Sequence, residues 1–504
     1  MLMKCAKVYG VAHKTSIQSD NTGNRLHSTN SEPRFESPFR YLIPSGYDPG
    51  MRVPAILFGN ARTVESAWKD GSVRQAINVS TLPSILKASI AMPDIHGGYG
   101  FPIGGVAAFD YDGGIISPGG VGYDINCGVS LFTVPLTYPK FTERRKEVID
   151  EIFNRVPSGL GNKSSEPVSM NDMVQIMNEG LNWAVNNGLA LSEDRERTED
   201  GGVMKGESIS GVSNAARQRG KNQVGTLGAG NHFLEVQRVE KIFDHDIARK
   251  FGLGEEDQIT FMIHTGSRGL GHQVATDHLK EISGKFSGPP LMDTQLMYAE
   301  IHGRQGISYL GAMAAAANFG FVNRAVIGWR VRQAFRKVFG IEESEIKLVY
   351  SLAHNIAKPE EHEIEGKRTK VMVHRKGATR AFPAGKAEGI FTSTGHPVIV
   401  PGDMGSRSYL LVGDTENMNL SFGSSCHGAG RLLSRHGSLN TFRESEVMEK
   451  LKNEGVYARF STRKVMLEEA PGSYKNIDEV IGITTGAQLA RSVAMMKPVG
   501  VVKG

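Results

Sequence analysis

The sequence predicts an α+β fold built as a single large mixed domain. Two observations carry this prediction: short apolar, β-branched segments are mixed with helical segments from about residue 50 onward, and no repeat or low-complexity linker divides them. At 504 residues the chain is long for one hydrophobic core, so its length is compatible with two domains or with one elaborated core. Because no linker is visible, we expect one domain over residues 36–504.

Residues 1–35 differ in composition from the rest of the chain, with frequent Ser, Thr, Asn and His. Their charged residues are the basic Lys4, Lys7, Lys14, Arg25 and Arg34 and the acidic Asp20 and Glu32. This bias is typical of a flexible extension and also of an organelle-targeting segment. The apolar core of a secretory signal is absent, so we expect an intracellular protein and leave cytoplasm, nucleus and organelle open.

Six segments predict strands, because each is a run of β-branched and apolar residues flanked by Gly, Pro or Asp. They are residues 128–134, 232–239, 258–264, 346–353, 368–374 and 396–400. Most of the candidate ligands described below lie at the ends of these strands.

Seven segments have helical character: residues 143–155, 170–187, 274–281, 307–322, 329–339, 444–454 and 476–482. The alanine-rich segment 307–322 predicts a closely packed buried helix. No run of eighteen or more apolar residues occurs, so we expect no transmembrane helix. A basic stripe follows, formed by Arg324, Arg330, Arg332, Arg336 and Lys337. Such a stripe is usually a solvated helix face, and contact with a phosphate backbone is the alternative.

Composition narrows the class of protein. A net charge of +5 is compatible with a polyanionic partner without requiring one. Three cysteines are too few for a disulfide framework, which indicates a reducing compartment. The chain has 60 glycines among its 504 residues, which is nearly twice the average usage of about 7%. These glycines cluster around histidines. Because glycine contributes little packing energy, this pattern indicates backbone that approaches a ligand closely.

Five side chains form a candidate metal centre. Asp124 and Cys127 are three residues apart in a glycine-flanked loop, where a carboxylate and a thiolate reach one cation and the sulfur has lone pairs to bridge two. This pattern alone is weak, because free cysteine is often simply a buried apolar residue. His232, His264 and His354 each end or follow a predicted strand and strengthen the case. Five ligands suit two metals that share the cysteine, and ligand softness alone suggests zinc.

His427 lies in the segment SSCHGAGR. Residues 428–430 are predicted to open a helix whose free N–H groups favour a phosphate, and an imidazole presented there is a competent nucleophile. A capping loop with an incidental histidine is the alternative.

Two further segments suit nucleotide contact: PGDMGSRSY over residues 401–409 and the terminal PVGVVKG with Lys503. A lysine one residue from the end is otherwise usually mobile and solvated. The stretch GTLGAGNHF is not a dinucleotide fingerprint, because it leads into a strand and lacks the G-x-G-x-x-G spacing.

Together these segments resemble the RtcB family of RNA-splicing ligases over roughly residues 50–504. The matching segments are MPDIHGGYGF, SPGGVGYDINCG, GTLGAGNHFLE, HTGSRGLGHQ, SLAHN, PGDMGSRSY, SSCHGAGR and the terminal lysine. Eight segments in the expected order are far more specific than any single motif.

The resemblance implies a ligase that joins an RNA 3′-phosphate or 2′,3′-cyclic phosphate to a 5′-hydroxyl, with GTP as co-substrate. It implies two Mn²⁺ per active site in place of zinc. Asp124, Cys127 and His232 would hold one ion, and Cys127, His264 and His354 the other. His427 would carry the guanylyl group.

The resemblance also implies a guanylate pocket. Its residues would be Asn231, His232, Phe233, Leu234, Glu235, His354, Asn355, Pro401, Gly402, Asp403, Met404, Ser408, His427, Gly428, Ala429, Gly430 and Lys503. His96, in the first matching segment, is expected near the RNA or the metals without being a ligand. The expected partners are RNA, such as tRNA halves, an archease-like activator and subunits of a tRNA-ligase complex, with no membrane.

Two other functions stay open from the sequence: a metal-dependent phosphodiesterase that only opens cyclic phosphates, and a catalytically silent RNA-binding subunit. A pure hydrolase would not need His427 and the guanylate segments. A silent subunit would tolerate the loss of ligands, yet every expected position is filled.

Overall fold

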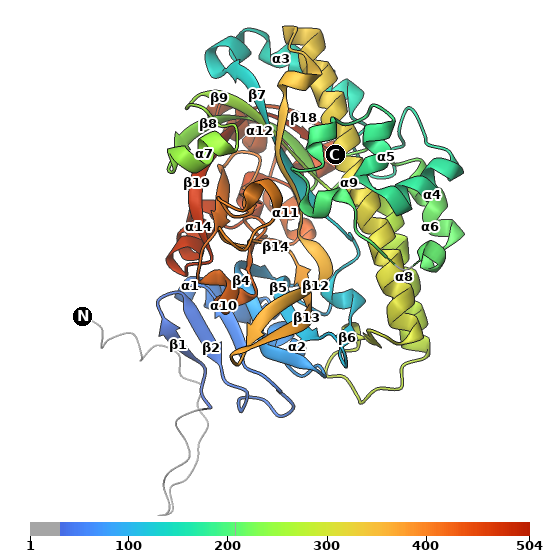
Figure 1. Cartoon of the computed structure of the whole chain (residues 1–504). Coiled ribbons are helices and arrows are strands. Elements are labelled where there is room, and N and C mark those ends of the chain that lie inside the picture. The colour runs from blue at the N-terminus through green and yellow to red at the C-terminus, as the bar shows by residue number, and fades with distance from the viewer. Residues whose placement is uncertain (1–30, 207) are drawn as a thin grey trace, which may run out of the picture.

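The computed structural model describes residues 31–206 and 208–504 of the chain (Figure 1). Most of the predicted extension over residues 1–35 lies outside the described residues. Strand β1 (Arg34–Ser37) begins just before the expected boundary and pairs antiparallel with β2 (Arg40–Ile43).

Two large sheets form the frame of the molecule. The first, in the lower part of Figure 1, has the order β1-β2-β3-β4-β5-β13-β12. Its further strands are β3 (Ala55–Phe58), β4 (Ile85–His96), β5 (Ile103–Asp110), β12 (Asn355–Ile364) and β13 (Lys367–Lys376). The second sheet has the order β11-β7-β9-β8-β19-β16-β15, with β18 parallel to β19. Its strands are β7 (Gly128–Thr137), β8 (Phe233–Ile242), β9 (Gln258–Thr265), β11 (Lys347–Ala353), β15 (Pro397–Val400), β16 (Ser408–Gly413), β18 (Tyr457–Phe460) and β19 (Ala490–Lys503).

Two short ladders complete the strands. They pair β6 (Ile115–Ile116) with β10 (Ala299–Glu300), and β14 (Ala378–Arg380) with β17 (Ser424–Cys426). All six predicted strands are confirmed, as β7, β8, β9, β11, β13 and β15. Strands such as β12 escaped prediction because their sequence is polar: β12 reads NIAKPEEHEI, and two of its charged residues, Lys358 and Glu360, are neutralised by partners inside the fold.

The helices surround these sheets. They are α1 (Ala61–Lys69), α2 (Ser72–Val79), α3 (Tyr138–Arg155), α4 (Met170–Glu179), α5 (Leu181–Asn186), α6 (Asn214–Lys221), α7 (His245–Lys250), α8 (Arg268–Gly284), α9 (Arg304–Phe339), α10 (Asn417–Ser421), α11 (Arg435–Thr441), α12 (Glu444–Asn453), α13 (Arg463–Glu468) and α14 (Ile477–Gly486). Helices α4, α5 and α8 pack along α9 and form a helical layer beside the sheets (Figure 1).

The prediction of one helix over residues 170–187 was wrong, because the structure breaks it into α4 and α5 at Gly180. Gly180 has φ of +53°, and a Cβ there would lie 2.3 Å from the carbonyl oxygen of Gly202. Only glycine fits this turn without displacing the neighbouring backbone.

Helix α9 is continuous over 36 residues, although two helices were predicted there. Asn323, at the expected break, is buried and donates to the carbonyl oxygens of Thr226 and Gly266, each at 3.1 Å. Tertiary contacts of this kind override the weak local propensity. By length and composition α9 is apolar enough to span a membrane, but 89% of its apolar window is buried inside the molecule, as in a core helix.

The basic stripe of α9 is not simply a solvated face. Arg324 and Arg332 are 0% and 1% exposed. Arg332 forms two hydrogen bonds to the carboxylate of Asp194, at 2.7 and 2.9 Å. Arg336 and Lys337 are exposed and form ion pairs at the surface. The sequence could not separate these two groups, because the stripe encircles a helix that is buried on most sides.

Candidate active site

The predicted metal ligands meet at one edge of the second sheet. In the register of the strands, Gly128 of β7 lies opposite Ala353 of β11. Phe233 of β8 lies opposite His264 of β9. His264 is itself a candidate ligand. The residues next to Gly128, Ala353 and Phe233 in the chain are the candidate ligands Cys127, His354 and His232. Neighbouring strands therefore deliver four ligands to the same place, and Asp124 reaches it from the loop before β7.

The donor atoms form two sets that share the sulfur of Cys127. On one side, Cys127 Sγ lies 3.3 Å from His264 Nε2, which lies 3.2 Å from His354 Nε2. On the other side, Cys127 Sγ lies 3.5 Å from His232 Nε2, which lies 2.8 Å from Asp124 Oδ2. Within each set all ligand atoms lie within 4.8 Å of one another. Ligand atoms bound to one cation at about 2.0–2.3 Å lie roughly 2.8–3.8 Å apart, for angles between 90° and the tetrahedral value, so both sets fit a metal ion.

The electrostatics of the ligands agree with this fit. Burial lowers the pKa of His264 and of His354 well below the usual value, so both imidazoles are neutral, which is the form that binds a metal. Burial and then the Asp124 carboxylate raise the pKa of the Cys127 thiol. Asp124 Oδ1 is buried without a hydrogen-bond partner among the described residues. A cation between these groups would satisfy that oxygen and stabilise the thiolate.

Arg324 of α9 supports the ligand loops from behind. Its Nη1 donates to the carbonyl oxygens of Asn126 and Thr265, at 2.8 and 3.0 Å. Asn126 adopts a left-handed backbone with φ of +51°. Because Asn126 and Thr265 directly adjoin Cys127 and His264, this guanidinium fixes the backbone on either side of the shared sulfur.

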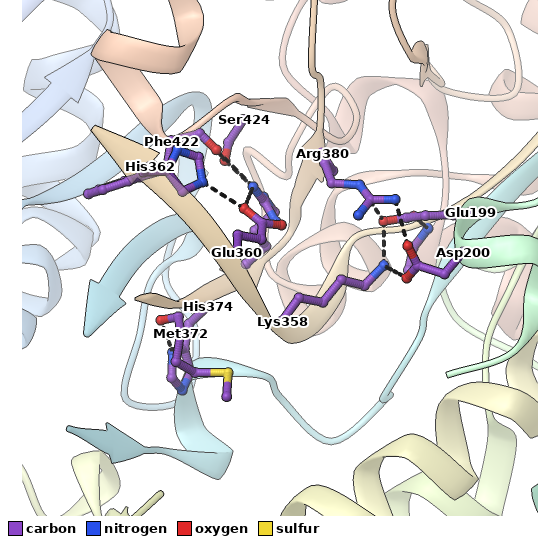
Figure 2. A network of polar contacts seen from close by, with 12 residues as sticks. Glu199, Asp200, Lys358, Glu360, His362, Met372, His374, Arg380, Phe422 and Ser424 are labelled. Atoms are coloured by element: carbon purple, nitrogen blue, oxygen red, sulfur yellow. Dashed lines mark hydrogen bonds and ion pairs between the residues drawn. The ribbon is translucent and has the colours of Figure 1, made fainter. Parts of the chain in front are cut away.

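A buried ion network holds the strand that leads to His354 (Figure 2). Glu199 accepts from the backbone N–H of Ala353 at 2.7 Å and from Lys358 Nζ at 2.6 Å. Arg380 bridges Glu199 and Asp200, and Lys358 also contacts Asp200. The network ties β11, β12 and β14 together at the edge that carries the ligands.

His427 lies directly beyond β17 and beside the metal ligands. Its Nδ1 lies 2.5 Å from Asp94 Oδ2, which also accepts from the His427 backbone N–H at 3.0 Å. Its ring centroid lies 4.9 Å from that of His354. Burial alone would raise the pKa of Asp94, but the charge and hydrogen bonds of His427 hold it below the usual value. The Asp94 carboxylate therefore fixes one ring nitrogen and leaves Nε2 for chemistry.

The prediction that residues 428–430 open a helix was wrong. They form an irregular segment, and α11 begins only at Arg435. Gly430 has φ of +74°, and a Cβ there would lie 2.3 Å from the carbonyl oxygen of Asp94. The N–H of Ala429 donates to the carbonyl oxygen of Pro401 at 3.0 Å. The segment is thus held against two neighbouring loops in a conformation that no helix can adopt.

One pocket joins His427 to the predicted nucleotide-binding residues. Its lining includes Cys127, Asn231, Phe233, Glu235, His264, His354, Asn355, Pro401, Gly402, Asp403, Met404, His427, Gly428, Ala429, Gly430 and Lys503. His96 lies in the same wall. Of the predicted guanylate residues, His232, Leu234 and Ser408 do not line this pocket, and His232 instead contacts Asp124 and Cys127. Side chains alternate along β8, so Leu234 points into the core, and Ser408 Oγ accepts from the backbone N–H of Gly402 at 3.2 Å.

The end of the chain closes this pocket. Lys503 is 4% exposed and belongs to β19, opposite Phe233, so the alternative of a mobile tail is wrong. Lys503 Nζ lies 3.5 Å from Glu469 Oε2. Burial raises the pKa of Glu235 to about 8, although the charge of Lys503 opposes this shift. A carboxyl group with this pKa can donate as well as accept a hydrogen bond near neutral pH.

Several residues of the site were not predicted from the sequence. Asp94 lies in MPDIHGGYGF, a segment already singled out for the family resemblance, and that position was a signal that could have been used, although its partner His427 is 333 residues away. Arg431, Arg435 and Tyr474 also line the pocket. Arg431 ends the matching segment SSCHGAGR, so its position was a signal, whereas nothing in the local sequence distinguishes Arg435 and Tyr474.

Comparisons with known proteins agree with this geometry. The family model described as tRNA-splicing ligase RtcB matches residues 75–504. A tRNA-splicing ligase RtcB of Thermococcus kodakarensis is 48% identical over 471 residues, covering 92% of this chain and 97% of the relative. Proteins of the same name from Archaeoglobus fulgidus and Nanoarchaeum equitans are 46% and 47% identical, covering 92% and 90% of this chain and 98% and 96% of the relatives. The chain therefore belongs to the RtcB family.

Proposed function

We propose that this protein is an RNA ligase of tRNA splicing and RNA repair that joins an RNA 3′-phosphate or 2′,3′-cyclic phosphate to a 5′-hydroxyl, using GTP and Mn²⁺. The observation that carries the proposal is the placement of His427 in one pocket with Cys127 and two of the histidines beside its sulfur, His264 and His354. The names of the relatives, which are tRNA-splicing ligases, support the choice of RNA as substrate.

Asp124, Cys127 and His232 would hold one Mn²⁺, and Cys127, His264 and His354 a second. When bound, these ions would neutralise negative charge that builds on phosphoryl oxygens and on departing pyrophosphate. The donor set alone would equally suit zinc, so the choice of manganese rests on the family resemblance.

The protein's own residues account for the guanylyl transfer. His427 Nε2 attacks the α-phosphorus of GTP, forming an N–P bond and releasing pyrophosphate. Asp94 holds Nδ1 and stabilises the positive charge that the ring acquires. An oxygen of the RNA 3′-phosphate then attacks the same phosphorus, which breaks the N–P bond and returns its electron pair to His427. The product is an RNA(3′)pp(5′)G end.

The second transfer forms the RNA junction. The 5′-hydroxyl attacks the phosphorus of the RNA phosphate and forms the phosphodiester bond. The P–O–P bond to the guanylate breaks, GMP leaves with the electron pair of that bond, and the hydroxyl proton passes to solvent. A cyclic phosphate is opened by water to the 3′-monophosphate before these steps. Asn231 would position a phosphate, and Glu235 with Lys503 would contact guanine or its neighbourhood, because both line the pocket beyond His427.

We extend the proposal to partners and location. An archease-like activator and subunits of a tRNA-ligase complex are the expected protein partners. The expected location is intracellular, in the cytoplasm, the nucleus or an organelle addressed by residues 1–35.

A phosphodiesterase that only opens cyclic phosphates is less well supported. Such an enzyme needs the metal ions. It does not need a histidine that is held by a carboxylate in a nucleotide pocket. The arrangement of Asp94 and His427 thus favours the ligase.

The test is incubation with α-labelled GTP and Mn²⁺, comparing wild type with His427→Ala. We expect acid-labile, hydroxylamine-sensitive label on the wild type only, as for a histidine phosphoramidate. Absence of label on the wild type, together with opening of cyclic-phosphate RNA, would support the hydrolase instead.

A further inference from the structure

We propose that Tyr123 and His272 form a stacking platform for the base at a broken RNA end. The inference rests on the proposed RNA ligase function and deepens it, because it identifies which part of the substrate is held outside the guanylate pocket. The pair stands on a groove that runs from the metal ligands to the surface.

The groove adjoins both parts of the active site. It shares Asp124 and His232 with the metal ligands, and Asn231 and Arg435 with the guanylate pocket. A strand lying in it therefore has its end beside the candidate metals. A groove with this position suits an RNA end better than GTP, which has its own pocket.

The charge of the groove favours a phosphate backbone. Its cationic lining residues are Lys163, Arg219, Arg268 and Arg435. Among the described residues that line it, Asp124, a candidate metal ligand, is the only acidic one. Gln218, Asn222 and Gln223 add amide groups that can bond to sugars and phosphates.

The aromatic pair gives this groove a surface for a base. The ring centroids of Tyr123 and His272 lie 4.9 Å apart with an interplanar angle of 28°, which is a stacked arrangement. The Tyr99 ring meets Tyr123 edge-on at 5.3 Å and supports it from the side. His272 is exposed, and both members of the stacked pair line the groove.

Stacking explains how such a groove could accept different RNA ends. Every base has a flat face, so a stacking platform binds with little sequence preference while cations track the backbone. Tyr123 directly precedes Asp124 in the chain, so a base held on this pair would be placed close to the metal ligands.

The test uses two short RNA strands, one with a 3′-phosphate and one with a 5′-hydroxyl, each with its terminal nucleotide intact or abasic. Binding to the full-length protein is measured by fluorescence anisotropy at one salt concentration. For one of the two strands, we expect removal of the terminal base to weaken binding to the wild type by about tenfold. His272→Leu and Tyr123→Leu should weaken the intact strand by a similar factor and leave the abasic strand unchanged, whereas Tyr123→Phe should bind like the wild type.

His245→Leu is the matched control, because His245 is an exposed histidine on α7, outside the groove lining. Equal binding of intact and abasic strands by the wild type, for both strands, would overturn the platform. The platform would also be overturned if the variants lost as much affinity for the abasic strand as for the intact strand. The binding assay needs no GTP, so failure of His427 labelling would count against the proposed function and not against the platform.

Discussion

At the scale of single residues, the chemistry depends on side chains whose state is set by one neighbour. His427 has one ring nitrogen committed to Asp94 at 2.5 Å, and Cys127 is a buried thiol between two histidines. Neither residue is reactive by type alone. The fixed imidazole and the shared sulfur arise from contacts between segments that are far apart in the chain.

Asp94→Asn should slow guanylylation of His427 by about 10²–10⁴-fold, the range for losing a group that orients a catalytic histidine or takes part in proton transfer. The amide can still form a hydrogen bond but no longer stabilises the positive ring. The rate of label transfer from α-labelled GTP measures the effect. Asp112→Asn, an exposed carboxylate in the same region of the chain, should react like the wild type. An unchanged rate in Asp94→Asn would exclude this role.

Mn²⁺ binding should release a proton from Cys127 at neutral pH. Burial raises the pKa of this thiol, so the metal-free protein holds the proton and must lose it when the thiolate binds. The apparent affinity for Mn²⁺, and with it the activity, should therefore fall as the pH falls. Calorimetric titrations in buffers of different ionisation enthalpy count the protons. Equal affinity at pH 6 and pH 8 would contradict the assignment of Cys127 as a ligand.

At the scale of elements, the sequence predicts much of the site because ligands at strand ends have clear local signals. Glycine-rich segments around Cys127, His232 and His427 led to the prediction of these residues, and the structure brings them to one place. Their convergence depends on the register between β7, β8, β9 and β11, which is a property of pairing across the sheet. The helix predicted to open at residues 428–430 was wrong because of contacts between distant segments. Contacts with Asp94 and Pro401 hold these residues out of a helix, and α11 begins only at Arg435.

Lys358→Met should destabilise the protein by about 3–5 kcal/mol, the usual cost of breaking a buried ion network. The substitution removes the closer cation of the buried Glu199 carboxylate, at 2.6 Å, and leaves Arg380 to pair with both Glu199 and Asp200. A shift in the urea midpoint measures the loss. Lys347→Met is the control, because Lys347 pairs with Glu193 at the surface and should contribute about 0–1 kcal/mol. Equal effects of the two substitutions would show that the network does not hold β12.

At the scale of the whole molecule, the two sheets and the helical layer bury many ionisable groups besides the ligands. His374 is buried, and its Nε2 accepts from the backbone N–H of Ser117 at 3.1 Å, whereas His96 is partly exposed in the wall of the pocket. Such histidines could not be separated from functional ones by sequence. His374 packs against the rings of Phe101 and Phe109, whereas His96 contacts the backbone of Asp94 and lines the pocket. This difference arises only from the fold.

Burial lowers the pKa of His96 and of His374 to about 4. The unfolded chain takes up these protons near the ordinary pKa of about 6.5, whereas the folded chain resists them until about pH 4. The free energy of unfolding should therefore decrease as the pH falls from about 6.5 to 4. Urea unfolding across this range tests the slope, and His374→Leu should make it shallower. A slope that does not differ between wild type and variant would show that His374 is protonated in the folded state.

The central claim is that one sulfur joins two cation sites beside the histidine that carries the guanylyl group. Electron paramagnetic resonance of the protein loaded with Mn²⁺ tests it most directly, because two ions bridged by a thiolate are magnetically coupled. We predict a coupled spectrum from two ions per chain in the wild type, replaced in Cys127→Ala by isolated ions or none. A wild-type spectrum of a single isolated ion, or of two uncoupled ions at saturation, would contradict the account.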